Sequence, residues 1–355
     1  MNSIEANNCT IHFNENCYTA LNQHLKSRNF SKVFILVDEN THQLCLPRFL
    51  EQLETSAAIE IIEIESGEIN KNIDTCVGVW NTLSELNADR KSLLINIGGG
   101  VITDLGGFVA CTFKRGIAYV NVPTTLLSMV DASVGGKTGV DLGHLKNQIG
   151  VISNPDMVLI DTQFLSTLAQ NQMRSGLAEM LKHGLISDLK YWNKFQDLSK
   201  LSLDDLDALI YESVLIKKNV VDIDPFEDGL RKTLNFGHTL GHAIESYFLS
   251  HPDKKTLLHG EAIVIGMILA CYISTVLTGF PKETTQNIKQ LFIDYYGKET
   301  IDEADYQPIM DLLKYDKKNN HGNINFVLLE AIGTPKIDCL VDDAIILDAF
   351  EFYAS

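Results

Sequence analysis

Residues 93–104 read LLINIGGGVITD, a short apolar run that passes through three glycines directly into a helical pattern. This order predicts a β-strand, a tight turn and a helix, with bare backbone N–H groups and the positive end of the helix at the turn, where a phosphate could bind. The stretch is not the G-x-G-x-x-G fingerprint, and a tight strand-to-helix turn needs glycines about as often as a nucleotide site does. It therefore indicates an α/β fold and leaves the ligand open.

Similar short runs recur on both sides of this stretch and alternate with segments of helical pattern or length. The runs are Lys32–Asp38, Ile59–Ile64, Leu93–Ile97, Tyr119–Val122 and Met157–Asp161. Such alternation predicts a parallel sheet covered by helices, with its ligand at the carboxyl edge of the strands. We therefore predict a Rossmann-like nucleotide domain over residues 1–161. Asp38 ends the first run and could accept ribose hydroxyls, although an exposed strand-end carboxylate is the commoner case.

After Asp161 the strand pattern fades and helical patterns take over, apart from one late run, Ile324–Leu329, that suits a short strand. We predict a second, mainly α-helical domain over residues 162–355. Its most apolar run, Ala262–Leu277, falls short of the roughly 20 residues that a membrane span needs. This run is expected to form a buried helix, and no membrane partner is predicted.

The composition narrows the possible partners and the compartment. Of the 355 residues, 45% are hydrophobic and 21% charged, which allows two buried cores in a soluble protein. The net charge of −17 argues against nucleic acid, which needs a basic surface, but a few lysines and arginines can still attract an anionic metabolite. The seven cysteines include no C-x-x-C pair, which favours unpaired thiols. With no secretory signal visible, we expect a cytoplasmic protein.

Residues 130–141 read VDASVGGKTGVD and set charged residues among apolar ones and glycines. The two glycines before Lys137 permit close backbone approach, and the lysine supplies a point charge for a phosphate. A solvated glycine hairpin with an incidental lysine is the alternative.

Glu179 and Lys182 stand three residues apart in GLAEMLKHG (residues 176–184) and would share one face of a helix. A surface salt bridge is the usual explanation for such a pair. The apolar residues around it weaken that explanation without excluding it.

The clearest polar pattern is RKTLNFGHTLGH at residues 231–242. Its polar residues are spaced by four, three and four, which forms one stripe on a continuous α-helix. The stripe consists of Arg231, Asn235, His238 and His242. Gly237 and Gly241 each cost about 1 kcal/mol relative to alanine inside a helix, so we expect them to let another backbone approach closely.

His259, in LHGEA (residues 258–262), brings a third imidazole at the start of the apolar helix. Together with Glu179 and His238 it would form a three-ligand set with an open position, which is the arrangement of catalytic zinc. The spacing alone does not select these three residues, and chance histidines remain the alternative.

Seven motifs occur in this order along the chain: GGGVITD, VPTTLL, VDASVGGKTGVD, KNQIG, GLAEMLKHG, GLRKTLNFGHTLGHAIE and LHGEA. Together they resemble those of the 3-dehydroquinate synthases, a family of sugar-phosphate cyclases, from about Asp38 to the Asp-Lys-Lys at 316–318. The resemblance implies a lyase of the shikimate pathway of aromatic amino acid biosynthesis. It converts 3-deoxy-D-arabino-heptulosonate 7-phosphate to 3-dehydroquinate and phosphate by transient NAD oxidation, phosphate elimination, re-reduction and aldol closure. It further implies a cytoplasmic homodimer.

The resemblance also implies roles for individual residues. It makes Glu179, His238 and His259 the ligands of Zn2+, or of Co2+. It assigns to the NAD environment Asp38, Glu68, Lys71, Gly99, Gly100, Val101, Ile102, Thr103, Asp104, Thr124, Thr125, Lys137, Lys146, Phe164 and Thr167. It places around the sugar phosphate Asp131, Lys137, Asn147, Lys182, Lys217, Arg231, Asn235, His242 and Lys317, with Lys318 as the alternative to Lys317. It suggests that Arg115 reaches the substrate phosphate of a neighbouring subunit.

Three departures from the family pattern concern loops: Phe113–Gly116, Asp141–His144 and the length of 246–258. Other functions stay open, namely another sugar-phosphate cyclase, an NAD- and metal-dependent polyol phosphate dehydrogenase, and a catalytically silent NAD-binding protein. The guanidinium of Arg231 favours a substrate with a carboxylate, because its planar fork pairs with both carboxylate oxygens.

Overall fold

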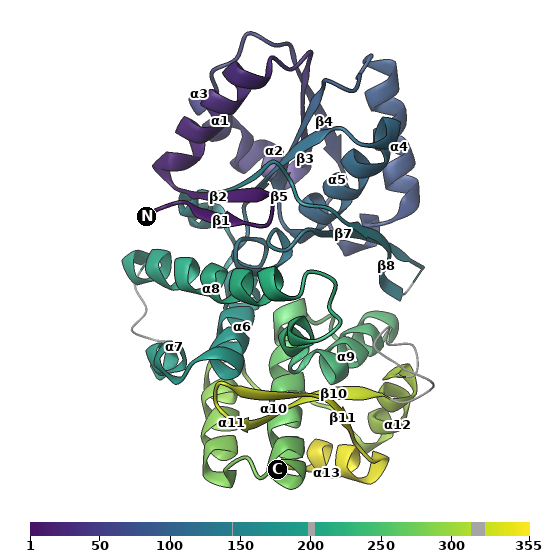
Figure 1. The fold of residues 1–355 in the computed structure, drawn as a ribbon. Coiled ribbons are helices and arrows are strands. Elements are labelled where there is room, and N and C mark those ends of the chain that lie inside the picture. Colours follow the sequence, from purple (N-terminus) through teal and green to yellow (C-terminus); the bar gives the residue numbers. More distant parts are fainter. Residues whose placement is uncertain (144, 198–202, 314–323) are drawn as a thin grey trace. The chain divides into compact units, whose positions relative to one another are not determined.

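The chain folds into two compact units, Met1–Met173 and Arg174–Ser355, in a computed structural model that describes residues 1–143, 145–197, 203–313 and 324–355 (Figure 1). This division falls later in the chain than the boundary predicted near residue 162. The segment after Ile160 is attached to the first unit, because the side-chain oxygen of Asn14 accepts hydrogen bonds from the backbone and hydroxyl of Thr162.

The first unit is built on a seven-stranded sheet of order β1-β2-β9-β6-β5-β3-β4, in which only the β1–β2 pair is antiparallel. The strands are β1 Ile4–Ala6, β2 Cys9–Phe13, β3 Val33–Asp38, β4 Ile59–Ile64, β5 Leu93–Gly98, β6 Ala118–Pro123 and β9 Met157–Ile160. All five predicted strands are confirmed in a parallel arrangement. The pattern missed β1 and β2, which are short and join the edge of the sheet through β9.

Short helices and one hairpin complete this unit. The α-helices are α1 Glu15–Arg28, α2 Glu39–Leu44, α3 Leu46–Gln52, α4 Ile73–Glu85 and α5 Gly100–Thr112. The short helical turns are η1 Glu68–Asn70, η2 Phe113–Arg115, η3 Ser128–Ala132 and η4 Thr162–Thr167, and the hairpin is β7 Lys137–Leu142 with β8 Leu145–Ile152. Helix α5 begins directly after β5, as the opening stretch predicts.

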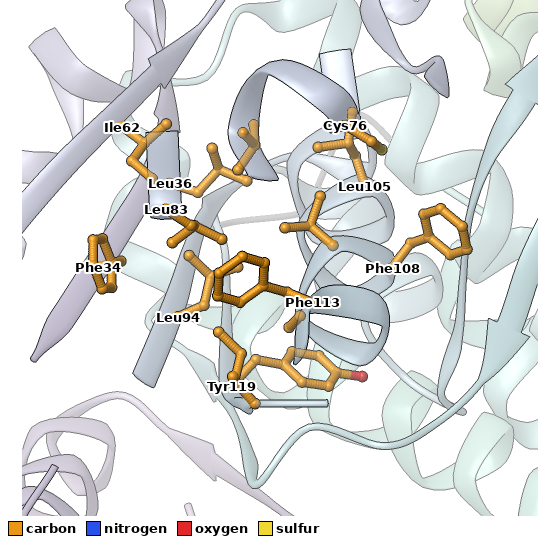
Figure 2. Packing of buried hydrophobic residues seen from close by; sticks show 14 of the residues in the cluster. Phe34, Leu36, Ile62, Cys76, Leu83, Leu94, Leu105, Phe108, Phe113 and Tyr119 are labelled. Carbon is orange, nitrogen blue, oxygen red and sulfur yellow. The ribbon is translucent and has the colours of Figure 1, made fainter. Parts of the chain in front are cut away.

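Helices α4 and α5 cover one face of the sheet through a shared apolar core (Figure 2). Leu36 and Leu94 come from β3 and β5, Leu83 from α4, and Leu105 and Phe108 from α5. Their burial fixes the helix that starts at the glycine turn against the strands that precede it.

The second unit is mainly helical, as predicted. Its α-helices are α6 Gln170–Ser187, which starts before the division, α7 Leu189–Trp192, α8 Leu203–Ile223, α9 His238–Ser250, α10 His259–Leu277, α11 Lys282–Tyr296, α12 Glu303–Leu312 and α13 Asp343–Ala354. The further elements in the described part of this unit are η5 Asn193–Phe195, η7 Leu230–Asn235 and the antiparallel pair β10 Asn325–Ala331 and β11 Thr334–Leu340. Strand β10 confirms the late strand, whereas its partner β11 was not predicted.

Helix α10 is the centre of this unit. It is long and apolar enough to cross a membrane by length and composition, but 72% of its most apolar window is buried against other parts of the protein. It packs against α9, α11, α13 and β10. The predicted buried helix is therefore confirmed.

Helices α9 and α10 approach each other through glycines. A Cβ atom on Gly266 of α10 would lie 2.0 Å from the carbonyl oxygen of Gly237 and 2.7 Å from the backbone nitrogen of Gly241. A Cβ atom on Gly237 would lie 2.5 Å from the Cγ atom of Met267. The expected close backbone approach is confirmed, and the packing reason for the two glycines is the neighbouring helix.

A change of glycine to alanine is expected to have opposite effects on stability at Gly266 and at Gly78. Gly266→Ala is expected to lower the free energy of unfolding by about 3 kcal/mol or more, because the methyl group would overlap backbone atoms that cannot rotate away. Gly78→Ala is the control, since a Cβ at this position on α4 meets nothing within 4 Å. It should raise the free energy of unfolding by about 0.5–1 kcal/mol. Urea unfolding curves measure both effects, and an unchanged midpoint for Gly266→Ala would contradict the packing argument.

Candidate functional site

The centre of the candidate site is Glu179, a fully buried carboxylate on α6. Lys182, one turn further along the helix, is only 1% exposed and forms an ion pair with it. The surface salt bridge that the spacing also allowed is therefore excluded. A buried pair of this kind is costly to desolvate, so its presence calls for a reason other than stability alone.

Two histidines face the same carboxylate from the first turns of two other helices. His238 is the first residue of α9, and its Nε2 lies 3.4 Å from Oε1 of Glu179. His259 is the first residue of α10, and its Nε2 lies 3.6 Å from the same oxygen. A third imidazole, that of His242, lies close by, since ring nitrogens of the three histidines all lie within 4.8 Å of one another.

In His238 and in His259, the other ring nitrogen has a partner that orients the ring. Nδ1 of His238 lies 3.2 Å from the carbonyl oxygen of Phe236. Nδ1 of His259 lies 3.2 Å from Oε2 of Glu245, a buried residue of α9. When the ring is neutral, a partner on Nδ1 favours the tautomer in which Nε2 carries the free lone pair, as in histidines that bind metals.

This donor set fits a divalent metal ion. Neither carboxylate oxygen of Glu179 accepts a hydrogen bond of normal geometry within the described part of the chain. Burial would raise the pKa of Glu179, but Lys182, His238 and His259 outweigh burial and hold it well below 4.5. An ionised carboxylate with two imidazole nitrogens turned toward it is a typical zinc or cobalt ligand set.

Electrostatics also act on His259. Burial lowers its pKa, whereas Glu245 and Glu179 outweigh burial and raise it to about 9. The two carboxylates therefore stabilise positive charge on this ring, which is the charge that a bound cation would supply instead.

A backbone contact brings the start of α10 to α6. The backbone N–H of Gly260 donates to the hydroxyl of Ser175, at 2.9 Å. A Cβ atom on Gly260 would lie 2.2 Å from the carbonyl oxygen of Ser175, so only glycine fits. This contact fixes His259, the preceding residue, at the level of Glu179 one turn along α6.

The stripe predicted on one continuous helix is wrong, because the chain breaks inside it. Arg231 and Asn235 lie on the short helix η7, whereas α9 begins only at His238. Gly237 between them has φ 77°, a left-handed conformation that ends one helix and lets the next start in another direction. Arg231 and Asn235 on η7 and the two histidines on α9 therefore do not form one continuous helical face.

The segment before α9 holds its polar side chains in place. The backbone N–H of Arg231 donates to Oδ2 of Asp224, and its guanidinium donates to the carbonyl of Pro225, at 2.6 Å. The amide of Asn235 donates to Oε1 of Glu227, also at 2.6 Å. Arg231 is 2% exposed, so a charged group is fixed here before any ligand binds.

The remaining residues predicted around the substrate are divided between the units. Lys217 is buried on α8, which ends before Asp224-Pro225 as expected, and His242 lies on α9. Asp131, Lys137, Asn147 and Arg115 belong to the first unit. Lys317, like its alternative Lys318, lies outside the described residues.

In the first unit, the glycine turn places several predicted NAD residues together. Gly99 caps α5, and a Cβ atom on it would lie 3.1 Å from Thr125. Val101, Ile102, Thr103 and Asp104 follow on α5, and Thr124 donates its backbone N–H to Gly98. The predicted turn is confirmed, while its ligand stays a prediction.

Lys71 connects two other predicted residues. Its buried Nζ donates to Oδ2 of Asp104 and to Oδ1 of Asn147, both at 2.6 Å. Burial opposes the charge of Lys71, yet Asp104 and Glu68 raise its pKa above the ordinary value. Asn147, predicted at the substrate, thus shares a contact with two residues predicted at NAD. Nearby, Nζ of Lys146 lies 3.3 Å from Oε1 of Glu68.

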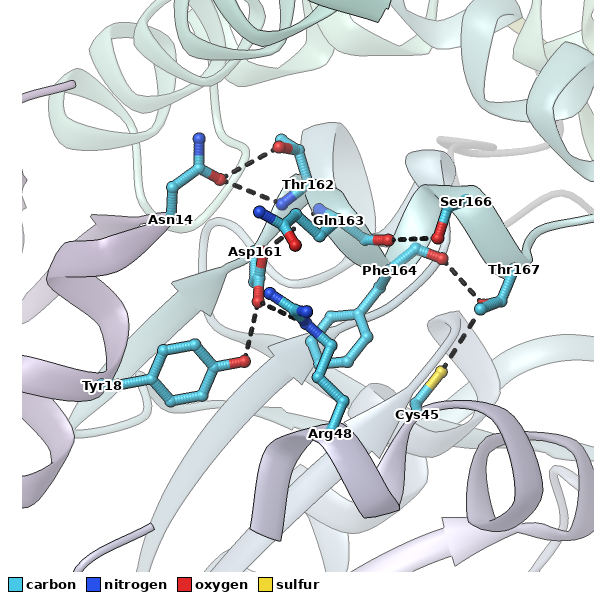
Figure 3. A network of polar contacts seen from close by, with 10 residues as sticks. All are labelled: Asn14, Tyr18, Cys45, Arg48, Asp161, Thr162, Gln163, Phe164, Ser166 and Thr167. Carbon is cyan, nitrogen blue, oxygen red and sulfur yellow. Dashed lines mark hydrogen bonds and ion pairs between the residues drawn. The ribbon is translucent and has the colours of Figure 1, made fainter. Parts of the chain in front are cut away.

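A second polar network holds η4, which carries Phe164 and Thr167 (Figure 3). Asp161 caps this turn and accepts hydrogen bonds from Tyr18 and Arg48. The sequence patterns did not single out Asp161 in this role, since its partners come from distant helices.

The structure gives a local role to Asp38 and to the glycines of residues 130–141. Asp38 ends β3 and caps α2 through the backbone N–H of Thr41, at 2.7 Å, which gives its carboxylate a task apart from ribose. The hairpin offered as the alternative for residues 130–141 exists, but its turn lies beyond Leu142. Gly135 and Gly136, with φ of 103° and 69°, instead form the turn that leads into Lys137.

Comparison with protein families gives two adjoining matches. Residues 61–175 match the family described as 3-dehydroquinate synthase N-terminal, and residues 176–319 match 3-dehydroquinate synthase C-terminal. A 3-dehydroquinate synthase of Parabacteroides distasonis is 42% identical over 335 residues, which cover 94% of each chain. One of Streptococcus pyogenes is 38% identical over 336 residues, which cover 94% of this chain and 93% of that protein.

Solved structures share the fold at lower sequence identity. A 2-deoxy-scyllo-inosose synthase complexed with carbaglucose-6-phosphate, NAD+ and Co2+ is 24% identical, with a TM-score of 0.86 over 99% of both chains. A 2-epi-5-epi-valiolone synthase of Streptomyces hygroscopicus with NAD+ and Zn2+ is 22% identical, with a TM-score of 0.85 over 100% of this chain and 99% of that one. A probable glycerol dehydrogenase of Sinorhizobium meliloti is 14% identical, with a TM-score of 0.63 over 97% of this chain and 95% of that one.

The buried ion pair predicts a large effect of removing one charge. In metal-free protein, Lys182→Met is expected to lower the free energy of unfolding by about 3–5 kcal/mol, because the carboxylate of Glu179 loses its closest positive charge. Lys194→Met is the control, since Lys194 and Glu212 form an ion pair with side chains 43% and 39% exposed. That change should cost less than about 1 kcal/mol. Urea unfolding measures both, and similar losses for the two variants would refute a buried charge pair at Glu179.

Proposed function

The chain belongs to the 3-dehydroquinate synthase family, and we propose that it converts 3-deoxy-D-arabino-heptulosonate 7-phosphate to 3-dehydroquinate and phosphate. The observation that carries this proposal is the buried Glu179 with the Nε2 atoms of His238 and His259 turned toward it. The identity of 42% over 94% of the chain supports the same reaction class, a phosphate-eliminating lyase. This activity would place the protein in the shikimate pathway.

NAD and a divalent metal are the proposed cofactors. Glu179, His238 and His259 would hold the metal, Zn2+ or Co2+, because imidazole and carboxylate ligands with an open position are typical of a catalytic site for such an ion. Solved relatives carry NAD+ with Co2+ or Zn2+. When bound, the two cofactors supply a Lewis acid at the hydroxyl being oxidised and an acceptor that returns its hydride.

The residues of the second unit have separate tasks in this proposal. Lys182, buried beside Glu179, stabilises negative charge on the substrate and moves a proton through its Nζ. His242 lies beside the two proposed histidine ligands and suits proton relay. Lys217 and Asn235 would bind the substrate, whose carboxylate we assign to Arg231.

The residues of the first unit would bind the nucleotide and the phosphate. Backbone N–H groups at the start of α5 suit the pyrophosphate, and Asp38 suits the ribose hydroxyls. Lys137 would contribute a positive charge to the phosphate, with Asp131 and Asn147 as further substrate contacts. Glu68, Lys71, Lys146, Phe164 and Thr167 complete the proposed NAD environment.

The activity is tested by incubating the purified protein with the heptulosonate phosphate and with NAD far below the substrate concentration. Phosphate and dehydroquinate should appear in equal amounts over many turnovers, because the hydride removed from the substrate returns to it. Prior chelation should abolish turnover, and His259→Ala should do the same while leaving NAD binding largely intact.

Three outcomes would contradict parts of the proposal. NADH released in proportion to product would indicate a polyol phosphate dehydrogenase. Faster cyclisation of glucose 6-phosphate or sedoheptulose 7-phosphate would indicate another cyclase, the alternative to which the structural similarity also points. Full turnover in rigorously metal-free protein would remove the metal from the mechanism.

We further propose a cytoplasmic homodimer in which Arg115 reaches the substrate phosphate of the neighbouring subunit. Arg115 is the last residue of η2, has φ 69° and is exposed, so its guanidinium is accessible to a neighbouring subunit. Sedimentation velocity of the purified protein measures the dimer, and a monomeric active enzyme would exclude a shared site.

Arg231 provides the test of substrate choice. Arg231→Lys keeps the charge but loses the planar fork, so we expect a loss of roughly 1.5–3 kcal/mol in transition-state binding for the heptulosonate phosphate. Lys232→Ala is the matched control, because Nζ of this neighbouring lysine lies 3.0 Å from Asp338 and so points to a different partner. It should change kcat/KM by no more than about 0.5 kcal/mol. Equal kcat/KM values for Arg231→Lys and the wild type would refute the assignment of the substrate carboxylate to Arg231.

A further inference from the structure

Glu245 holds an unusual position beside the proposed metal site. It lies on α9, two helical turns after His238, and is only 6% exposed although it is a carboxylate. Its Oε2 lies 3.2 Å from Nδ1 of His259, whose Nε2 lies 3.6 Å from Oε1 of Glu179. One imidazole ring therefore has a carboxylate at each of its two nitrogens.

The contact between Glu245 and His259 crosses from one helix to another. His259 is the first residue of α10, and the partner of its Nδ1 is a side chain of α9. His238 has its Nδ1 placed by the main-chain carbonyl of Phe236, which no side-chain substitution removes. The orientation of His259 thus depends on a side chain, whereas that of His238 depends on the backbone.

We propose that Glu245 is a positioning residue that fixes the ring and tautomer of His259, so that Nε2 is available to a divalent metal. The proposal rests on the metal role of His259 in the proposed function. In the neutral ring that a metal binds, Glu245 holds the proton on Nδ1 and leaves the lone pair on Nε2, and its negative charge strengthens Nε2 as a ligand. It does not itself bind the metal or the substrate.

A purely structural role would be an ion pair that ties α9 to α10. Glu261 provides the comparison for this role, since it also stabilises the start of α10. Its Oε2 accepts the backbone N–H of Leu258, at 2.9 Å, and it is partly exposed. If Glu245 only secured the helix, the two carboxylates would be equivalent in their effect on metal binding.

The experiment measures the affinity of metal-free full-length protein for Zn2+ by competition with a chromophoric chelator, and the absorption spectrum of the Co2+ form. Glu245→Leu removes the acceptor, and we expect about a 10- to 100-fold loss of Zn2+ affinity with an altered Co2+ spectrum. Glu245→Gln keeps an acceptor of the same shape without the charge, so its loss of Zn2+ affinity should be smaller. It therefore tests the role of Glu245 even if the leucine variant folds poorly. Glu261→Gln and NAD affinity should change little.

The outcomes separate this proposal from the one on which it rests. Loss of Zn2+ affinity in His259→Ala together with wild-type affinity and Co2+ spectra in both Glu245 variants would overturn the role of Glu245 alone. Equal losses in Glu245→Gln and Glu261→Gln would also overturn it, in favour of helix anchoring. Unchanged Zn2+ affinity in His259→Ala would overturn the metal assignment and the role of Glu245 with it.

Discussion

The ionised carboxylate of Glu179 is the constraint on which the arrangement of the second unit depends. A buried charge without partners costs several kcal/mol and neutralises itself by taking a proton. Lys182 on the same helix, together with imidazoles from the first turns of α9 and α10, provides the compensating interactions. Helices α6, α9 and α10 therefore converge at the carboxylate of Glu179, and this convergence constrains how they pack.

Backbone contacts at glycines make this meeting possible. Gly266 lies against Gly237 and Gly241 where α9 begins, and Gly260 lies against Ser175 of α6. Any side chain at these places would push apart the turns that carry His238 and His259. These glycines belong to the site in the sense that they set its dimensions, although none carries a functional group.

In both units a buried carboxylate holds a short segment in place through contacts with side chains of other elements. Asp161 secures the short turn η4 through Tyr18 and Arg48, which come from distant segments (Figure 3). Glu245 secures His259 across two helices in the same way. In each case a buried carboxylate makes a side-chain contact between two elements, and this contact holds a segment that carries proposed site residues.

The sequence by itself determined the α/β class, the five main strands, the buried helix and the residues Glu179, His238 and His259 as candidates, because strand alternation, glycine turns and motif order are properties of the chain. Only the tertiary structure decided that the Glu179–Lys182 pair is buried, since three-residue spacing looks the same on a surface. It also decided where the polar stripe breaks, because the left-handed Gly237 fits against Met267 of another helix. Glu245 likewise gains its partner only when α9 packs on α10. A sequence pattern indicates which residues share a face of one helix or strand, whereas burial and contacts between helices arise only when the elements pack together.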